Sequence, residues 1–377
     1  MRIVILSDFF VPHQQGGGER RYYEIGKRLV ERGHEVLVLS MRFPGVLDEE
    51  DVDGIIVKHI GPLIKNPPFR SALDFLHYIF SSSWWLLRND FDVIDANTYL
   101  PLIPGFIASR LRRKGCISTI HDTYKYSWDE WFYNSRLSYF FEKFLVKLPH
   151  KRIVTVSRKT RKSLIHEYGV DGKRITIVPD GVDLEKIDSV EVSDDEVDDK
   201  TVIHVGRLIP HKHVEDLLNA LNCLSDKDIK VKVVGTGFLE DKLRDLASDL
   251  GVGDRVVFTG FLPDYSDVIR EIKKSSVLVL CSTQEGFGMV LAEANACSKP
   301  VLTYNSGGVL EVVVPGKNGL IVRLRDVRQM AEAINYLLTN KQAAEEMGTY
   351  GRGRIEEKFS WDSITDKMEV LYGEARK

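Results

Sequence analysis

The chain has 377 residues, of which 43% are hydrophobic and 28% are charged, and its formal net charge is −3 at pH 7. This composition is that of a folded globular protein, so a disordered chain is excluded, and the length favours two domains with separate cores. The acidic balance argues against a general nucleic-acid binder. The charge is unevenly divided, because residues 1–188 sum to +4 and the remainder to −7.

The cysteines and the apolar runs restrict the class further. Four cysteines stand far apart in or beside apolar runs, which predicts buried free thiols rather than disulfides or metal ligands: Cys116, Cys223, Cys281 and Cys297. No apolar run approaches the ~20 residues of a membrane span, and the first residues enter a strand pattern without a signal peptide. We therefore expect a cytoplasmic protein that at most rests on the inner face of a membrane.

The first half of the chain alternates short apolar runs with helical patterns. We predict strands at 3–6, 36–39, 93–94, 117–120, 153–156 and 175–178. Helices are predicted at 19–32, 73–87, 102–113, 128–148 and 158–168. The strands are almost continuously apolar, which indicates a parallel sheet covered by helices on both faces.

Residues 191–199, EVSDDEVDD, break this rhythm and predict a solvated acidic linker. Strands then follow at 201–205, 230–234, 256–258, 277–280, 301–303 and 320–322, and helices at 214–223, 239–250, 266–274, 289–296 and 326–338. The sequence thus predicts an α/β protein of two doubly wound, Rossmann-like domains, residues 1–190 and 200–358. Their ligand cleft is expected at the carboxyl ends of the strands.

A glycine motif, Gly16-Gly17-Gly18, lies between the first strand and the first helix. Glycines let the backbone approach a ligand closely, and the free amides of a helix N-terminus attract anions. The pattern is not GxGxxG, and no acid ends the second strand, so a nicotinamide-dependent reductase is disfavoured. A turn required only by the chain geometry is the open alternative.

Two cations, Arg207 and Lys212, follow the first strand of the second domain. At the carboxyl edge of a sheet, such a pair can clamp a diphosphate and stabilise it as it departs. The alternative is two surface cations without a ligand. We expect His204 to be a core residue, and His211 and His213 lack the acidic partners of a metal site.

The most specific motif is EGFGMVLAE, from Glu285 to Glu293, which follows a strand and opens a helix. Glu285 can accept hydrogen bonds from sugar hydroxyls, and Glu293 can reach a ribose diol. The intervening amides suit a phosphate: Gly286, Phe287, Gly288, Met289 and Val290. A glycosidase-like acid/base pair, or a helix cap with a surface glutamate, is the alternative.

Together these motifs resemble glycosyltransferase family 4, which has the GT-B fold. The resemblance is carried by five stretches in order: the glycine loop with Glu31–Val36 behind it, Thr119–Asp122, Val178–Asp183, Gly206–Leu208 with Lys212, and Glu285–Glu293. Two departures stand out. The usual Pro-Asn-Gly is Pro179-Asp180-Gly181 here, and Asp95-Ala96-Asn97 replaces the histidines that face the acceptor in many members, so the acceptor cannot be carried over.

The resemblance implies a retaining enzyme that moves a hexosyl group from a nucleotide-diphosphate sugar, a UDP- or GDP-sugar, to a hydroxyl acceptor such as a lipid-linked or polysaccharide intermediate. It places the donor's diphosphate on Arg207 and Lys212, its ribose on Glu293 and its sugar on Glu285. It also implies roles for Gly17 and Gly18 near the donor phosphate or the acceptor, for His121 near the sugar's C6 hydroxyl, and for the backbone at Phe261 and Leu262 near the nucleobase.

The resemblance further implies front-face attack, in which the leaving phosphate helps to deprotonate the acceptor. No metal or other cofactor is expected, and the sequence has no DxD motif at a fitting position. The last stretch, 359–377, is implied to be a helix that crosses back to the first domain. A sugar-nucleotide epimerase on the same fold and a non-catalytic nucleotide-sugar-binding protein are the alternatives.

Aromatic and basic residues concentrate in the first domain. Residues 124–148 include Trp128, Trp131 and Phe132 with lysines nearby, and the helix at 73–87 carries Trp84 and Trp85. Such helices can lie in a membrane interface, which agrees with the positive charge of this half. The alternative is that the apolar residues with helical spacing form core: Leu137, Phe140, Phe141, Phe144, Leu145 and Leu148.

Overall fold

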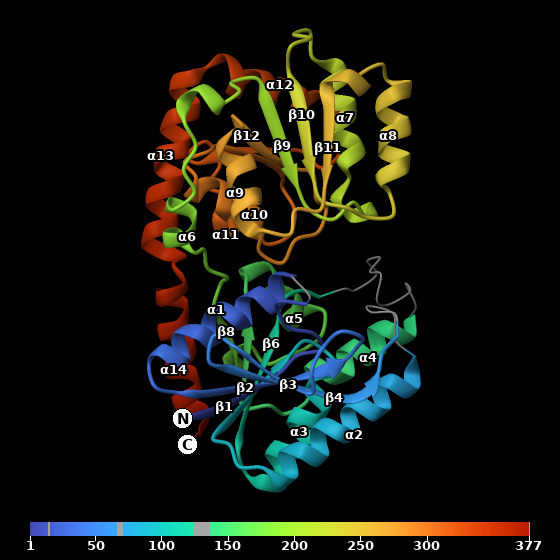
Figure 1. Ribbon diagram of the computed structural model, residues 1–377, viewed down its shortest axis with the longest axis vertical. Coiled ribbons are helices and arrows are strands. Elements are labelled where there is room, and N and C mark those ends of the chain that lie inside the picture. The colour runs from blue at the N-terminus through green and yellow to red at the C-terminus, as the bar shows by residue number, and fades with distance from the viewer. Residues whose placement is uncertain (14–15, 66–70, 124–135, 377) are drawn as a thin grey trace. The chain divides into compact units, whose positions relative to one another are not determined.

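The computed structural model describes residues 1–376 except 14–15, 66–70 and 124–135 (Figure 1). The chain divides into two compact units. One comprises Met1–Asp180 together with Trp361–Lys377, and the other comprises Gly181–Ser360. Each unit is a parallel sheet with helices on both faces, as the sequence predicted.

The first unit is built on an eight-stranded sheet in the order β3-β4-β2-β1-β5-β6-β7-β8. Every neighbouring pair is parallel except β3 and β4. The strands are β1 (Arg2–Leu6), β2 (Glu35–Arg42), β3 (Glu49–Val52), β4 (Ile55–Leu63), β5 (Val93–Asn97), β6 (Gly115–Ile120), β7 (Arg152–Thr155) and β8 (Ile175–Ile177).

The sequence analysis missed the hairpin of β3 and β4. Its acidic first strand reads as a loop, but Asp53 and Gly54 between the strands both have left-handed backbone, with φ of 52° and 81°. A two-residue Asp-Gly turn of this kind matches the twist of an antiparallel pair. The dipeptide was the signal that could have revealed the hairpin.

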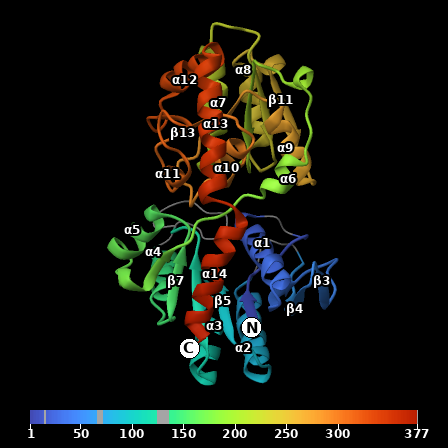
Figure 2. The same ribbon diagram turned by 90° about the vertical axis from the view of Figure 1, so that its left-hand side faces the viewer.

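Helices cover the two faces of this sheet differently. They are α1 (Gly17–Glu31), α2 (Ala72–Arg88), α3 (Leu102–Arg112), α4 (Arg136–Val146), α5 (Arg158–His166) and α14 (Trp361–Arg376). On one face, buried side chains of β1, β2 and β5 share a hydrophobic cluster with α2, α3, α4 and α5. On the other, α1 packs beside α14, and α14 contacts β6 (Figure 2). The predicted return of the last helix to the first domain is confirmed.

A buried carboxylate fixes this second face. Asp95 on β5 is fully buried and accepts hydrogen bonds from the hydroxyls of Tyr22 (3.0 Å), Thr119 (2.8 Å) and Tyr372 (2.7 Å). Burial raises its pKa, although the hydroxyl donors oppose that rise. The expectation that this position faces the acceptor is wrong for Asp95, because its side chain lies in the core beneath α1 and α14.

The second unit contains a six-stranded parallel sheet in the order β11-β10-β9-β12-β13-β14. Its strands are β9 (Thr201–Val205), β10 (Lys230–Val234), β11 (Val256–Gly260), β12 (Val277–Leu280), β13 (Val301–Tyr304) and β14 (Gly319–Val322). The winding direction reverses between β9 and β12, and in the first unit it reverses between β1 and β5. In doubly wound sheets, ligands bind beside such a reversal at the carboxyl ends of the strands.

Eight α-helices are found in the described part of the second unit: α6 (Leu184–Asp188), α7 (Val214–Cys223), α8 (Glu240–Asp249), α9 (Tyr265–Lys273), α10 (Met289–Ala296), α11 (Val309–Val312), α12 (Val327–Thr339) and α13 (Lys341–Lys358). The sequence analysis did not predict α13, whose three glycines weaken helix propensity. Two of them allow close packing. A Cβ on Gly348 would lie 2.0 Å from the carbonyl oxygen of Ser298, and one on Gly351 2.8 Å from the Asn295 side chain.

Three further expectations concern the acidic stretch, the cysteines and membrane-spanning helices. The acidic stretch 191–199 is no free linker, because Asp198 N donates to Lys274 O (2.9 Å) and Glu196 pairs with Lys274 (2.6 Å). All four cysteines are free thiols, as predicted, but only Cys116 and Cys281 are buried; Cys297 is half-buried and Cys223 is exposed. Among the described residues, no helix has the length and apolar character needed to cross a membrane.

We expect Tyr372→Phe to lower the stability of the first unit by about 1–2 kcal/mol, because the buried Asp95 loses one of its hydrogen-bond donors. Urea denaturation followed by circular dichroism measures the change. Tyr350→Phe, at a half-exposed ring on α13, is the control and should behave as the wild type. Equal stability of Tyr372→Phe and the wild type would contradict the role assigned to Asp95.

Candidate functional site

The crevice expected in the second unit is at the strand reversal, where the loops after β9 and β12 meet. These strands are neighbours in the sheet, so residues 206–213 and 281–288 emerge side by side at the carboxyl edge (Figure 1). The two loops are joined directly, because Thr283 N donates a hydrogen bond to His211 O (2.9 Å). Two motifs that are more than seventy residues apart in the sequence are thereby brought into one site.

Lys212 and Glu285 form an ion pair at this edge, with 2.5 Å between Nζ and Oε1. Their side chains are 16% and 14% exposed, so both remain within reach of solvent. Burial raises the pKa of Glu285, but the charge of Lys212 and its hydrogen bond outweigh this and hold the pKa below its ordinary value. The pair therefore presents a full cation and a full anion side by side.

Glycines of adjacent loops hold these two segments in place. A Cβ on Gly307 would lie 2.1 Å from Glu285 O, and one on Gly235 would lie 2.1 Å from Gly206 O. Gly308 N also donates to Glu285 O (2.6 Å). Only glycine permits such close backbone approach, so residues after β10 and β13 support the site. Sequence reasoning missed these glycines, although each follows a predicted strand.

The other predicted residues of this unit lie close to Lys212 or Glu285 in the sequence. Arg207 is exposed on the same loop as Lys212, and Glu293 is 7% exposed on α10. Gly288, with φ of 91°, precedes α10, and the first helical residues Met289 and Val290 are half-buried. Gly286 is half-buried as well. Phe287 is buried instead and packs edge-on against Phe359, with 5.5 Å between ring centroids, so its side chain belongs to the core.

At the edge strand of the same sheet, Phe261 and Leu262 directly follow β11. Phe261 is 60% exposed, whereas Leu262 is half-buried. An aromatic ring left this open at the carboxyl end of a strand offers an apolar surface for a flat ligand group.

The three histidines of this region are partly or fully buried or make contacts within the protein. His204 is fully buried and its Nδ1 donates to Val279 O (3.1 Å), so it is the core residue that was predicted. Burial lowers its pKa to about 4. Burial, assisted by Lys212, also lowers the pKa of His211 to about 4. His213 contacts Glu215 (2.8 Å) at the start of α7.

The first unit has its own cluster at the reversal between β1 and β5. Gly18 is the second residue of α1, Asn97 ends β5 and His121 follows β6. A Cβ on Gly18 would lie 3.4 Å from His121 Nε2 and 3.6 Å from Asn97 Nδ2. Gly16 and Gly17 are exposed beside it. The structure therefore brings the glycine motif and His121 together.

His121 is held as a neutral ring. Burial lowers its pKa to about 4, an effect that Asp180 opposes and Arg21 strengthens. Its Nε2 is buried and has no hydrogen-bond partner among the described residues. An unsatisfied polar atom beside an open glycine backbone is where a ligand hydroxyl could bind.

Arg21 explains the unusual Asp180. Its side chain is fully buried, and its Nη1 donates to Asp180 Oδ1 (2.8 Å) and to Pro179 O (2.7 Å). The extra negative charge of the Pro-Asp-Gly turn is thus paired with a cation from α1. Breaking a buried pair of this kind leaves an uncompensated charge. Sequence reasoning missed Arg21, whose position three residues after Gly18 was its only signal.

Two family models together match nearly the whole chain. The family described as "Glycosyltransferase Family 4" matches residues 15–186, and "Glycosyl transferases group 1" matches residues 186–354. An uncharacterized glycosyltransferase of Methanocaldococcus jannaschii is 26% identical over 99% of this chain and 98% of its own. A GDP-mannose-dependent phosphatidylinositol monomannoside mannosyltransferase of Mycobacterium tuberculosis is 30% identical over 57% of this chain and 60% of its own.

Solved structures agree in fold. Sucrose-phosphate synthase from Thermosynechococcus elongatus superposes with a TM-score of 0.85 at 22% identity, covering 99% of this chain and 98% of that one. HepE from Anabaena, solved in complex with UDP-glucose, gives a TM-score of 0.80 at 21% identity, covering 98% and 99%. Both likenesses extend through the two units.

We expect the stability of the protein to fall as the pH drops from about 6.5 to about 4. In this window the unfolded chain protonates His204, whereas the folded ring, with its pKa of about 4, stays neutral. One such proton contributes a slope of about 1.4 kcal/mol per pH unit. Urea denaturation across the window measures the slope, and His121 and His211 act in the same direction.

His204→Gln separates this effect from others, because the amide can still donate to Val279 O but does not titrate. It should flatten the slope, whereas His166→Gln, at an exposed position on α5, should leave it unchanged. A slope in His204→Gln equal to that of the wild type would refute the assignment.

Proposed function

The chain belongs to the glycosyltransferases of family 4 and group 1, and we propose that it transfers a hexosyl group, with retention of anomeric configuration, from a nucleotide-diphosphate sugar to a hydroxyl acceptor. The proposed donor is a UDP- or GDP-sugar. The UDP-glucose complex of HepE and the GDP-mannose dependence of the mycobacterial relative support these two classes.

The observation that carries this proposal is the pairing of Lys212 with Glu285 beside the strand reversal. A diphosphate offers Lys212 a new anionic partner, and Arg207 on the same loop can add a second cation. Glu285 is then free to accept hydrogen bonds from the sugar's hydroxyls, and charged acceptors make the strongest bonds of this type. One existing ion pair is exchanged for contacts to both halves of the donor.

The remaining donor contacts follow from the same edge of the sheet. Glu293 on α10 is assigned to the ribose diol, and the amides from Gly286 to Val290 are assigned to the phosphates. Phe261 and Leu262 are assigned to the nucleobase, because the exposed ring of Phe261 provides an apolar surface for it. These assignments rest on the family's motif and on the positions of the residues in this unit.

The reaction requires charge stabilisation more than a protein base. The bond between the anomeric carbon and the phosphate oxygen breaks, and the acceptor oxygen bonds to the same face of that carbon. The acceptor's proton passes to the departing phosphate oxygen. Arg207 and Lys212 stabilise the negative charge that develops there, so we propose that transfer needs no metal ion. The family resemblance assigns Gly17 and Gly18 to the donor phosphate or the acceptor, and the neutral His121 to the C6 hydroxyl of the sugar.

Two other functions would use the same donor site. A sugar-nucleotide epimerase needs acid/base groups on both faces of the sugar, and His121 alone is a candidate among the described residues of the glycine cluster. A nucleotide-sugar sensor would bind the donor and release no product. Product analysis distinguishes transfer to an acceptor from an isomerised sugar and from no reaction.

We expect Lys212→Ala to lower turnover by at least about 100-fold while the fold is retained, because the departing diphosphate loses a cation. The wild type is first screened with UDP-, GDP- and ADP-sugars by thermal shift, and the stabilising donor is then used for product analysis. Lys232→Ala removes another half-buried lysine, which lies on β10 and pairs with Glu271 of α9, and should stay active. Full activity of Lys212→Ala would refute the site.

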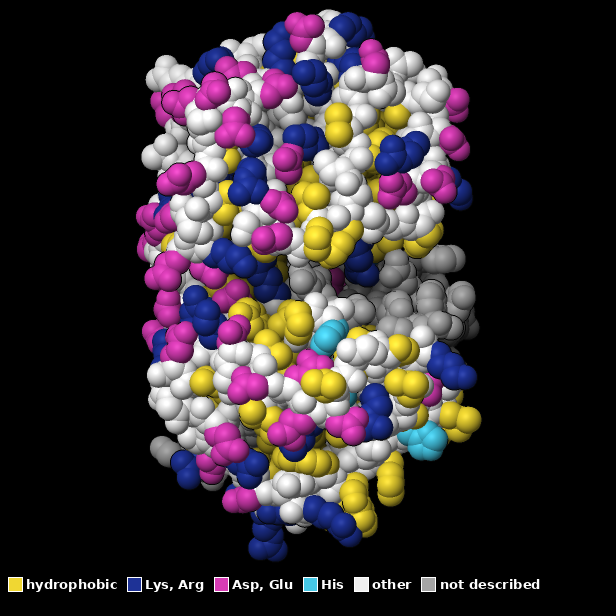
Figure 3. Space-filling view, in the orientation of Figure 1, with side chains coloured by type: hydrophobic (Ala, Val, Ile, Leu, Met, Phe, Trp, Pro, Cys, Tyr) yellow, Lys and Arg dark blue, Asp and Glu magenta, His cyan; other side chains and the backbone are white. Residues whose placement is uncertain are grey.

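The acceptor is proposed to be lipid-linked, because the first unit carries an exposed hydrophobic stripe on α2. Leu73, Leu76, Phe80 and Trp84 are 67%, 62%, 66% and 49% exposed and recur at helical spacing. Figure 3 shows hydrophobic side chains standing out at the lower right, over this helix. The guanidinium of Arg88 lies 3.7 Å from the ring centroid of Trp84, so cationic and aromatic groups alternate here.

The apolar residues on and near α4, which could alternatively form core, are partly buried and partly exposed in the structure. Leu145 and Leu148 on or just after α4 are buried, whereas Phe140 and Phe144 are 64% and 61% exposed and Phe141 is 36% exposed. Trp85 packs against the core cluster. Trp128, Trp131, Phe132 and the side chain of Leu137 lie outside the described part of the chain. We propose that α2 and α4 rest on an anionic membrane surface.

Replacing Phe80 by Asp should weaken binding to anionic phosphatidylglycerol vesicles by roughly tenfold or more, since burying a phenylalanine contributes about 1.5–3 kcal/mol. Co-sedimentation at low and moderate salt measures this binding. Leu324→Asp, at a hydrophobic residue of the second unit that is 52% exposed, should sediment as the wild type does. Absence of wild-type binding at both salt concentrations would sink the proposal.

A further inference from the structure

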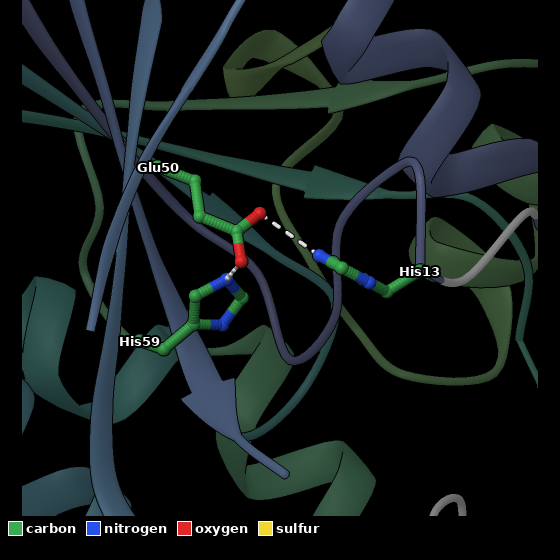
Figure 4. A group of neighbouring side chains, drawn as sticks. All are labelled: His13, Glu50 and His59. Carbon is green, nitrogen blue, oxygen red and sulfur yellow. Dashed lines mark hydrogen bonds and ion pairs between the residues drawn. The ribbon is translucent and has the colours of Figure 1, made fainter. Parts of the chain in front are cut away.

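Three side chains from separate segments of the first unit converge near the glycine motif (Figure 4). His13 lies in the loop between β1 and α1, Glu50 on β3 and His59 on β4. His13 Nε2 is 2.8 Å from Glu50 Oε2, and His59 Nε2 is 3.9 Å from Glu50 Oε1. The three potential ligand atoms all lie within 4.8 Å of one another.

The hairpin determines two of these positions. Its Asp53-Gly54 turn sets a register in which Glu50 lies opposite Val57. His59 is two residues beyond Val57 on the same strand, so the side chains of Glu50 and His59 point to the same face as diagonal neighbours. The loop from β1 brings His13 to them, and its ring packs edge-on against Phe43, with 5.7 Å between centroids.

His59 is oriented as metal-binding histidines are. It is 1% exposed, and its Nδ1 lies 2.9 Å from Met41 O. A carbonyl can only accept, so Nδ1 carries the proton and Nε2 presents its lone pair toward Glu50 and His13. That buried Nε2 has no hydrogen-bond partner among the described residues. A backbone carbonyl behind the second ring nitrogen is the usual arrangement that fixes a histidine ligand.

We propose that His13, Glu50 and His59 form a binding site for one divalent transition-metal ion of the zinc class. Two imidazole nitrogens and one carboxylate oxygen are a donor set that such ions prefer, and water can take the fourth position. Bonds of about 2.0–2.1 Å place the ligands of a tetrahedral ion roughly 3.3 Å apart. His13 and His59 lie 2.8 and 3.9 Å from the two different oxygens of Glu50, and the three ligand atoms lie within 4.8 Å of one another, so side-chain shifts of roughly an ångström bring them to that spacing.

The charges around the cluster are compatible with a bound cation. Arg42 on β2 is the nearby positive group, and it pairs with Asp48 (2.9 Å). Glu50 accepts a hydrogen bond from Leu47 N (2.8 Å), so its carboxylate is held in place before an ion binds.

The consequence concerns the glycine motif. His13 lies three residues before Gly16, and an ion would join this loop to the β3-β4 hairpin. The site would thereby restrain the start of α1 and the position of Gly18 beside His121. This role is structural and separate from the clamp of Arg207 and Lys212, which belongs to the other unit.

The test uses the full-length protein freed of metal by a chelator and then titrated with Co²⁺, whose visible absorption reports its ligands. We expect saturation at one ion per chain, displacement by Zn²⁺, and a rise in the apparent melting temperature with Zn²⁺. Glu50→Gln and His59→Gln should each weaken Co²⁺ binding by about tenfold or more.

His166→Gln, at the exposed histidine of α5, is the matched control and should bind Co²⁺ as the wild type does. Glu50→Gln keeps an oxygen that can accept from Leu47 N, and its amide NH2 can donate to His13 Nε2, so it is expected to fold, and circular dichroism checks this. A wild type without a saturable cobalt spectrum, or a folded Glu50→Gln that binds cobalt equally well, would overturn the proposal and leave a hydrogen-bonded cluster only.

Discussion

A buried carboxylate is tolerated in a protein core only when hydrogen bonds satisfy it, and the first unit depends on this constraint at Asp95. Its partners come from α1, β6 and α14. The same elements carry the functional cluster, because α1 begins at the glycine motif, β6 leads to His121, and β5 itself ends at Asn97. One polar group in the interior therefore sets the mutual positions of residues that meet at the edge of the sheet.

In the second unit, backbone contacts fix the mutual positions of the site residues. Its site loops are fixed by glycines that approach Gly206 and Glu285 closely, and by the hydrogen bond from Thr283 to His211. Rigid loops leave Lys212 and Glu285 as the adaptable part. Because each satisfies the other before a ligand arrives, neither charge is left uncompensated at the crevice, and a ligand must offer groups of both kinds to replace the pair.

Local patterns in the sequence were sufficient for most of this architecture. Apolar runs located the parallel strands except β4, and the motifs around Lys212 and Glu285 marked two loops that the structure joins, because both signals are contiguous in the chain. Features that depend on distant partners were missed. The charged strand at Glu50 becomes recognisable only when paired with β4, the glycines of α13 only when α10 packs on them, and Arg21 only when Asp180 is opposite.

The placement of α14 has a consequence for how the protein is made. The last helix completes the first unit, so the whole of the second unit, residues 181–360, is an insertion within it. A ribosome finishes the inserted unit before it delivers Tyr372, the partner of Asp95. The first unit is therefore the later of the two to acquire all its contacts, and a chain that stops between Ser360 and Tyr372 would contain the whole inserted unit but lack this partner of Asp95.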